Sequence, residues 1–406
     1  MRLNRSVWRV DFTGMRIMDS LSCEHEEGKG GGLGLWLGIR RHPGVRRVVR
    51  RWNGAAKRAF SAVLSCLPAA RSISLMELTD VRRVLLVRPN FRIGNTLISA
   101  RLIPSVKARF PGARIDFLGA DKTVPLVEHL GLGRVESVSR AYVYRPDRFI
   151  ALVRRLRRER YDLVIDAGRG SFTAALMALM AGGRVRLGQD RGRLRCFLNV
   201  RLNVERRPYI YDGWAAFADA IHPGAVPLPL YRVSPDEREE ALRWLGARRF
   251  TRDGDVLPFV AVFVGGHLEK RMPVSFWRDV LANLARNGVR VLLFDGPEEK
   301  HLVSECAGVA ADDFLVVPIQ SLRKTAALCE QAAFVVSPDT GTLHLAAALE
   351  RPTISVLRVD VSMKYAPHGR QDQRLMRPSP DDVLAAVMPQ WRHAVAAQGA
   401  RSRKCA

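Results

Sequence analysis

Short apolar runs alternate with helical patterns along this chain, and this alternation constrains the fold more than any other feature. The runs at 83–87, 113–118 and 161–166 are rich in Val, Leu and Ile, which is typical of strands covered on both faces. A helical pattern follows the first run as far as Phe110, and another follows the third run over Phe172–Met180. Strand–helix alternation predicts a parallel sheet.

The alternation begins again after Pro258. We expect strands at 259–264, 289–294, 314–317, 333–336 and 353–357, separated by helices at 276–286, 298–307, 322–331 and 343–349. A polar stretch around Pro235 separates the two series. The fold class predicted is therefore α/β, with two Rossmann-like lobes whose parallel sheets face each other across a cleft. Ligands bind such sheets at the carboxyl ends of the strands, so the loops after the strands are the expected sites of chemistry.

The predicted divisions of the chain follow from these two series. They are an N-terminal extension at 1–80, a first lobe at 81–235, a second lobe at 236–375, and a C-terminal helix and tail at 376–406. No acidic residue occurs from Gly28 to Met76, and apolar and Trp residues lie between the arginines there. A basic helix of this kind can bind an anionic membrane surface. A linker, or a helix packed on the first lobe, fits the pattern equally well.

The formal net charge of +25 favours an anionic partner. Within the predicted first lobe, basic residues gather at Arg154–Arg160 and Arg184–Arg195, where they could bind a phosphorylated lipid-linked glycan. The alternative is that arginine fills solvated positions generally, since basic residues occur along the whole chain. We expect no specific nucleic-acid binding, because no recognised motif is present and aromatic residues make up only 7%.

Cysteine usage and hydropathy bear on the compartment. The six cysteines are scattered and form no CxxC pair, so neither a zinc site nor a disulfide framework is predicted, and a reducing cytoplasm is expected. No apolar run approaches the roughly twenty residues of a spanning helix, and the N-terminus lacks the pattern of a secretory signal. The expected location is cytoplasmic, with peripheral contact at the inner face of the membrane.

The most informative segment, SPDTGTLHLAAAL, occupies residues 337–349, directly after a predicted strand. Asp339 and Thr340 can cap the following helix, and Gly341 allows a ligand to approach the backbone closely. The amide groups at the start of this helix suit a diphosphate, and His344 on its first turn would reach the same ligand. Spacing alone fits an ordinary capped helix with His344 in the core at least as well.

The residues themselves say more than their spacing. The string Asp-Thr-Gly-x-x-His-Leu-x-x-Ala-Leu, followed by Pro352, closely resembles the signature of glycosyltransferase family 9, the lipopolysaccharide heptosyltransferase-like enzymes. The resemblance covers residues 81–375. It implies the two-lobed GT-B fold and inverting transfer of heptose or a similar sugar to a lipopolysaccharide-core or other lipid-linked glycan acceptor. The donor implied is a nucleotide-diphosphate sugar such as ADP-heptose, with no separate cofactor and no metal.

The resemblance also assigns residues of the donor lobe. The segment 262–273, which contains Gly265 and Gly266, is similar to the family's loop ending in Lys-x-x-Pro, and the family lysine at the donor phosphates corresponds to Lys270. A fixed ammonium group stabilises the charge that develops on the departing diphosphate, without a metal. In the loop after the strand at 289–294, Glu299 aligns with the family's ribose-binding glutamate, and Glu298 is the competing position.

The first lobe shows one departure from the family. Residues 87–97 resemble the opening strand and Gly-rich turn, which implies that Arg92, Gly94 and Asn95 lie on the acceptor side. The family most often has an aspartate directly after this glycine, where it is read as the general base. Asn95 stands there instead, and an amide cannot accept a proton at neutral pH.

Three consequences of Asn95 remain open. Another carboxylate could act as the base, with Asp166 the first candidate and Asp121 the second, while Asn95 orients the acceptor hydroxyl. The transition state could instead be dissociative enough to need only late deprotonation. The third alternative is a catalytically degenerate relative that binds a nucleotide sugar as a sensor or scaffold.

Overall fold

The computed structural model describes residues 70–143, 145–190, 195–224, 231–296, 300–306 and 314–405. Predictions for residues 1–69, and for Glu298 and Glu299, lie outside the described residues.

The first lobe is a parallel sheet of six strands in the order β3-β2-β1-β4-β5-β6. The strands are β1 (Arg83–Val87), β2 (Arg114–Ala120), β3 (Val135–Val138), β4 (Leu163–Asp166), β5 (Val185–Gln189) and β6 (Val200–Leu202). The helices are α3 (Ile93–Ser99), α4 (Leu102–Arg109), α5 (Pro146–Arg158), α6 (Phe172–Met180) and α7 (Ile210–Ile221). Side chains of β1 alternate between an apolar cluster with α4 and α7 and another with α5 and α6, because successive strand residues point to opposite faces.

The second lobe repeats this order with β11-β10-β9-β12-β13-β14, again all parallel. Its strands are β9 (Val260–Phe263), β10 (Val291–Phe294), β11 (Phe314–Val317), β12 (Phe334–Ser337), β13 (Thr353–Leu357) and β14 (Gln373–Met376). Its helices are α8 (Pro235–Gly246), α9 (Val274–Arg286), α10 (Lys300–Cys306), α11 (Leu322–Gln331), α12 (Gly341–Ala348) and α13 (Pro380–Cys405), and a small hairpin joins β7 (Thr251–Arg252) to β8 (Asp255–Val256). The predicted fold class is confirmed.

One local prediction needs correction. The helical pattern that ends at Phe110 is two helices, α3 and α4, with a break at Ala100 and Arg101. Pro104 has no N–H to donate to the carbonyl of Ala100, and its ring crowds that carbonyl. The carbonyl of Ala100 instead accepts a hydrogen bond from the N–H of Ile103 at 3.0 Å.

The polar stretch around Pro235 is the first turn of α8. The side chain of Ser234 accepts the N–H of Glu237, and the side chain of Glu237 accepts the N–H of Ser234. This reciprocal cap, with proline at the first helical position, is a strong helix-start signal. The stretch that separates the two βα series is therefore ordered as a helix start.

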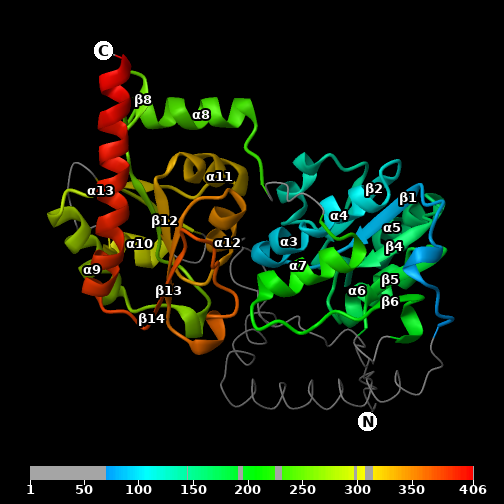
Figure 1. Ribbon diagram of the computed structural model, residues 1–406. Helices are drawn as coiled ribbons and strands as arrows, with labels where there is room; N and C mark the ends of the chain where they lie inside the picture. Colours follow the sequence, from blue (N-terminus) through cyan, green and yellow to red (C-terminus); the bar gives the residue numbers. More distant parts are fainter. Residues whose placement is uncertain are drawn as a thin grey trace, which may run out of the picture.

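The C-terminal helix α13 is longer than the predicted Asp381–Ala397, and its main contacts are with α9, β13 and β14 of the second lobe. Val383, Val387 and Trp391 of α13 join the apolar cluster beneath α9. Figure 1 shows α13 running along the outer side of that lobe. Among the residues that the structure describes, no helix is long and apolar enough to span a bilayer.

The two lobes contact each other mainly through α3 and α12, which lie side by side in the middle of the molecule (Figure 1). Leu97 of α3 packs in the same apolar cluster as Leu345 and Ala346 of α12. Because α3 follows β1 and α12 follows β12, the carboxyl ends of both sheets point toward this contact. We call the contact of α3 and α7 with α12 the lobe interface.

A second contact joins the lobes at one side. Arg323 of α11 donates from Nη1 to the carbonyl of Pro125 in the first lobe, at 3.1 Å, and also pairs with Glu237 of α8. The pairing with Glu237 holds the guanidinium in place within the second lobe, and its Nη1 makes one directed hydrogen bond to the first lobe.

Candidate active site

Several of the residues assigned to the donor come together at one point of the second sheet. The strand order reverses between β9 and β12, so the loops after these two strands diverge at the topological switch point where α/β sheets bind ligands. Gly265, Gly266 and Lys270 lie after β9, and Asp339 and Thr340 lie after β12.

Lys270 and Asp339 form a close ion pair across this switch point. Lys270 Nζ lies 2.5 Å from Oδ2 of Asp339. Asp339 is buried, with 8% of the residue exposed. A buried carboxylate requires a paired cation or strong hydrogen bonds. Asp339 therefore holds the Lys270 ammonium at the carboxyl edge of the sheet, where it also lies 5.4 Å from the ring centroid of Tyr365.

The start of α12 has backbone amides that no side-chain cap satisfies. Thr340 is the N-cap residue, but its hydroxyl bonds to the hydroxyls of Thr342 at 2.7 Å and Ser337 at 3.1 Å. The first N–H groups of a helix have no partner within it and carry its positive dipole end. Gly266, in the loop after β9, lies close to the side chain of Thr340. Its φ of +152° is a backbone conformation that residues other than glycine rarely adopt.

Gly94, Gly341 and His344 are brought together at the lobe interface. A Cβ on Gly94 would lie 2.0 Å from Cδ2 of His344, and one on Gly341 would lie 3.0 Å from Cβ of Ile93. These glycines therefore allow α3 and α12 to pack closely. The Nδ1 of His344 is hydrogen-bonded to the hydroxyl of Tyr211 at 2.7 Å, and sequence reasoning missed this partner on α7.

His344 is neutral at physiological pH. Its side chain is 7% exposed and its Nε2 lies 3.9 Å from Oδ1 of Asp339. Burial lowers the pKa of His344 to about 4, against the opposing effect of Asp339. The imidazole of His344 therefore connects the two lobes through its hydrogen bond to Tyr211. Its other nitrogen faces Asp339, the partner of Lys270.

We expect Gly94→Ala to destabilise the protein by about 1–3 kcal/mol, the usual effect of overpacking. The added methyl group conflicts with a buried, hydrogen-bonded ring. Gly399→Ala in α13 is the matched control, because a Cβ there meets no heavy atom within 4 Å and alanine favours a helix by up to about 1 kcal/mol. Urea unfolding should show opposite signs for the two changes. Equal stabilisation by both would show that α3 and α12 are not held in contact.

The turn between β1 and α3 is organised by Asn90. Its Oδ1 accepts the N–H of Arg92 at 2.8 Å and Nδ2 of Asn95 at 3.4 Å. Its carbonyl accepts the Thr123 hydroxyl at 3.2 Å. Asn95 is half-buried, and no described residue donates a hydrogen bond to its Oδ1. That oxygen can accept a hydrogen bond from a hydroxyl but cannot take its proton.

Both candidate carboxylates occupy ends of strands beside this turn. Asp166 ends β4, in register with Val87 of β1, and is 3% exposed. Its Oδ1 accepts the N–H of Gly168 at 2.6 Å, and burial raises its pKa to about 7. Asp121 follows β2, is half-buried, and accepts the N–H of Lys122 at 2.8 Å. Asp166 is therefore the candidate with an environment suited to proton transfer near neutral pH.

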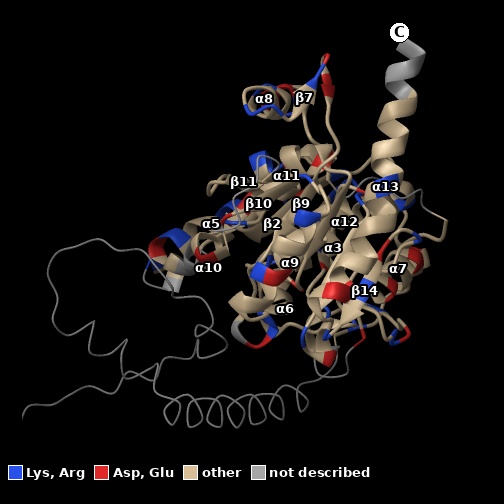
Figure 2. Cartoon of the chain, turned by 90° about the vertical axis from the view of Figure 1, so that its left-hand side faces the viewer, with Lys and Arg blue, Asp and Glu red and all other residues tan. Residues whose placement is uncertain are grey.

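Arg155, Arg160 and Arg184, which belong to the described part of the basic clusters noted in the sequence, do not lie at this edge. Arg160 and Arg184 lie at the opposite edge of the first sheet, where Arg184 N–H bonds to Tyr161 at the entry to β4. Arg155 of α5 pairs with Glu136. Figure 2 shows Lys and Arg on several separate elements, among them α5 and α9, with acidic residues between them. The described part of these clusters therefore fits solvated faces.

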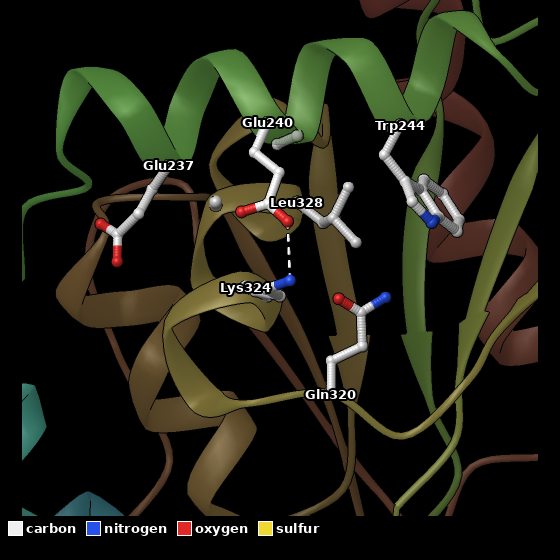
Figure 3. A pocket seen from close by; sticks show the side chains of 8 residues that line it. Glu237, Glu240, Trp244, Gln320, Lys324 and Leu328 are labelled. Atoms are coloured by element: carbon white, nitrogen blue, oxygen red, sulfur yellow. Dashed lines mark ion pairs between the residues drawn. The ribbon is translucent and has the colours of Figure 1, made fainter.

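A small hollow between α8 and α11 lies away from these residues (Figure 3). Trp244 and Leu328 contribute its apolar wall, and Lys324 pairs with Glu240 at 2.6 Å across it. Both charged side chains are about half exposed, so the pair is a weak surface interaction. None of the residues assigned to the donor or acceptor lines this hollow.

Comparison with solved structures identifies the architecture. A family 9 glycosyltransferase from Veillonella parvula superposes with a TM-score of 0.68 at 14% identity, covering 78% of this chain and 99% of its own. Escherichia coli heptosyltransferase WaaC with ADP gives 0.61 at 23% identity, covering 76% and 99%. The class defined is the two-lobed GT-B fold.

Sequence comparison then gives the family. The pattern of glycosyltransferase family 9 (heptosyltransferase) matches residues 149–381, more than half of the chain. Lipopolysaccharide heptosyltransferase 1 of Escherichia coli K12 is 28% identical over 298 residues, 68% of this chain and 87% of that protein. The chain belongs to glycosyltransferase family 9, which confirms the resemblance drawn from residues 337–349.

Proposed function

We propose that this protein transfers a heptose, with inversion at the anomeric carbon, from ADP-heptose to a hydroxyl of a lipopolysaccharide-core acceptor. The observation that carries the proposal is the ion pair of Lys270 with Asp339, directly before the uncapped start of α12 at the switch point of the second sheet. A similar Escherichia coli heptosyltransferase has been solved with ADP-2-deoxy-2-fluoro heptose, which supports this choice of donor.

The donor lobe stabilises the leaving group in this proposal. The diphosphate lies against the amides of Gly341 and Thr342, with the Lys270 ammonium beside it. As the glycosidic bond breaks, negative charge grows on the phosphate oxygens, and prepositioned donors stabilise this charge more than that of the ground state. Asp339 positions Lys270, and Glu299 remains the proposed ribose ligand.

The acceptor lobe orients and deprotonates the nucleophile, which is the acceptor hydroxyl. Asn95 Oδ1 accepts a hydrogen bond from the acceptor hydroxyl and orients it, and the carboxylate of Asp166 removes its proton as the oxygen attacks the anomeric carbon. One displacement by this oxygen inverts the configuration. A carboxylate with a pKa of about 7 is close to the optimum for a general base at neutral pH.

We place the reaction at the inner face of the cytoplasmic membrane, with peripheral contact. The proposed acceptor is anchored in lipid, and a chain with a net charge of +25 is attracted to anionic lipid headgroups.

A second candidate function is binding of a nucleotide sugar without turnover, and Asn95 is the observation that favours it. An assay that separates the two measures ADP and ADP-heptose binding by calorimetry, and heptose transfer to a lipopolysaccharide-core acceptor by mass spectrometry. Transfer, with the anomeric configuration of the product inverted by NMR, supports the enzyme. Binding without transfer supports the second candidate, and absence of ADP binding contradicts both.

A further inference from the structure

The Lys270 ammonium has a second contact besides Asp339, the ring of Tyr365. Its Nζ lies 5.4 Å from the ring centroid, within the distance at which an aromatic face attracts a cation. Tyr365 is half-buried and comes from the loop after β13, so it reaches Lys270 from a different strand than Asp339 does. The attraction comes from the electrostatic field of the ring, so it leaves the remaining N–H donors of the ammonium available for a ligand.

A lysine at this place needs a second contact because its side chain is flexible. The ammonium ends a four-carbon stem of rotatable bonds, and 25% of the Lys270 side chain is exposed. Asp339 holds the ammonium by one oxygen at 2.5 Å, and a contact with one oxygen sets a distance but not a direction. The ring of Tyr365 supplies the second fixed point.

The loop that carries Tyr365 is attached to the first lobe on both sides of this residue. On one side, the carbonyl of Lys364 accepts the N–H of Ile210 at 2.8 Å. Ile210 is the first residue of α7, and an N–H at that position has no partner within its own helix. On the other side, His368 stacks on Tyr209, with ring centroids 4.7 Å apart and an interplanar angle of 21°.

The first turn of α7 makes two more contacts of this kind, and Figure 1 shows α7 at the side of the first lobe that faces the second. Nε2 of His368 lies 3.0 Å from Oδ1 of Asp212. Tyr211, next to Asp212, is hydrogen-bonded to His344, whose Nε2 faces Asp339. One turn of the first lobe therefore supports both groups that contact the ammonium of the second lobe.

We propose that Tyr365 is a positioning residue for Lys270, and that the first turn of α7, residues 209–212, holds Tyr365 in place. The proposal rests on the proposed function, in which Lys270 acts on the departing diphosphate. It makes the acceptor lobe part of the donor machinery, because the ring stays against the ammonium only while Lys364 and His368 remain attached to α7.

The test is a double-mutant cycle on the full-length protein. Tyr365→Leu should lower kcat for heptose transfer about 2- to 30-fold, the range that exposed to desolvated cation–π contacts span, with little change in KM for ADP-heptose. In the Lys270→Ala background the same change should have no further effect, since no ammonium is left to position. Tyr365→Phe keeps the ring and should restore the rate that Tyr365→Leu loses.

ADP affinity, measured by calorimetry, is a readout that does not depend on transfer. ADP carries the charge of the departing diphosphate, so Tyr365→Leu should weaken its binding by a similar factor, and again not in the Lys270→Ala background. Tyr142→Leu is the matched control, because it removes a half-buried ring that packs against Phe149 within the first lobe. This control should have the wild-type kcat and ADP affinity.

His368→Ala tests the attachment to α7. It should lower kcat and ADP affinity as Tyr365→Leu does, and the two changes together should lower them no further than Tyr365→Leu alone. Undiminished losses from Tyr365→Leu in the Lys270→Ala background would overturn the proposal, and fully additive losses from His368→Ala and Tyr365→Leu would overturn the role of α7. A wild type that binds ADP but transfers no heptose contradicts the proposed function instead, and the cycle of ADP affinities still tests the positioning of Lys270.

Discussion

Replacing Lys270 by alanine is expected to lower the rate of heptose transfer by about 10²- to 10³-fold, the usual effect of removing one group that stabilises charge in a transition state. The ammonium lies at the switch point of the second sheet, held by Asp339 at 2.5 Å. In the proposed reaction this ammonium stabilises the departing diphosphate more strongly as the glycosidic bond breaks, so the loss should fall on kcat more than on KM for the donor.

The removal of Lys270 also leaves Asp339 buried and unpaired, which destabilises a protein and repels the diphosphate. The double variant Lys270→Ala with Asp339→Ala removes this carboxylate. It should recover stability in urea unfolding while the rate remains low. Initial rates at saturating ADP-heptose, measured on both variants, separate two effects. One is the loss of the Lys270 ammonium, and the other is the repulsion of the diphosphate by an unpaired Asp339 carboxylate.

Lys324→Ala is the matched control for this experiment. Like Lys270, Lys324 pairs with a carboxylate, that of Glu240. This pair lies at the hollow between α8 and α11, where both side chains are about half exposed (Figure 3). Its removal should change neither rate nor stability measurably. Full activity in the Lys270/Asp339 double variant would refute the role assigned to this pair.

Much of the fold could be predicted from the sequence, because buried parallel strands are apolar on both faces. The strands β1, β11 and β13 and the helices α6 and α11 have the predicted bounds. Edge strands such as β3, β6 and β14 were not predicted, since their half-exposed residues mix apolar and polar types. α8 was missed although Ser234 and Glu237 form a capping box, because its polar composition suggested a boundary.

The candidate site was predictable only where residue type and family resemblance coincide. Lys270 and Asp339 were assigned separately to the donor, and the structure adds that they bind each other. The contact of Gly94 with His344 joins residues 250 positions apart in two lobes, and no local pattern carries such information.

Replacing Asp166 by asparagine is expected to lower kcat/KM by about 10²- to 10⁴-fold, the range for loss of a general base. The change keeps the size of the side chain and an oxygen that can accept the N–H of Gly168, as Oδ1 now does at 2.6 Å. In the wild type, activity should rise with pH through about 7, because burial raises the pKa of Asp166 to that value. Asp166→Asn should lose this pH dependence.

Asp166→Asn should lower the rate without lowering the stability of the folded protein. That result would exclude unfolding as the cause of the lower rate. The folded-state pKa of Asp166 is raised from 3.8 to about 7, so between these values the folded protein binds more protons than the unfolded chain. Its contribution to stability is therefore complete below about 4 and is lost as pH rises through 7. Since asparagine does not ionise, Asp166→Asn should be at least as stable as wild type at pH 8, as urea unfolding would show.

The position of the base can be tested further by adding a carboxylate on α3. Asn95→Asp in the Asp166→Asn background supplies one next to the turn held by Asn90, and a partial recovery of rate would show that either side of the turn can take the acceptor proton. The same change in the wild type places two carboxylates at one site, where like charges raise the pKa of one of them, so the midpoint of the pH profile should shift upward. If Asp166→Asn alone retains the wild-type rate and pH profile, Asp166 is not the base, and the candidates are Asp121 or proton loss late in a dissociative reaction.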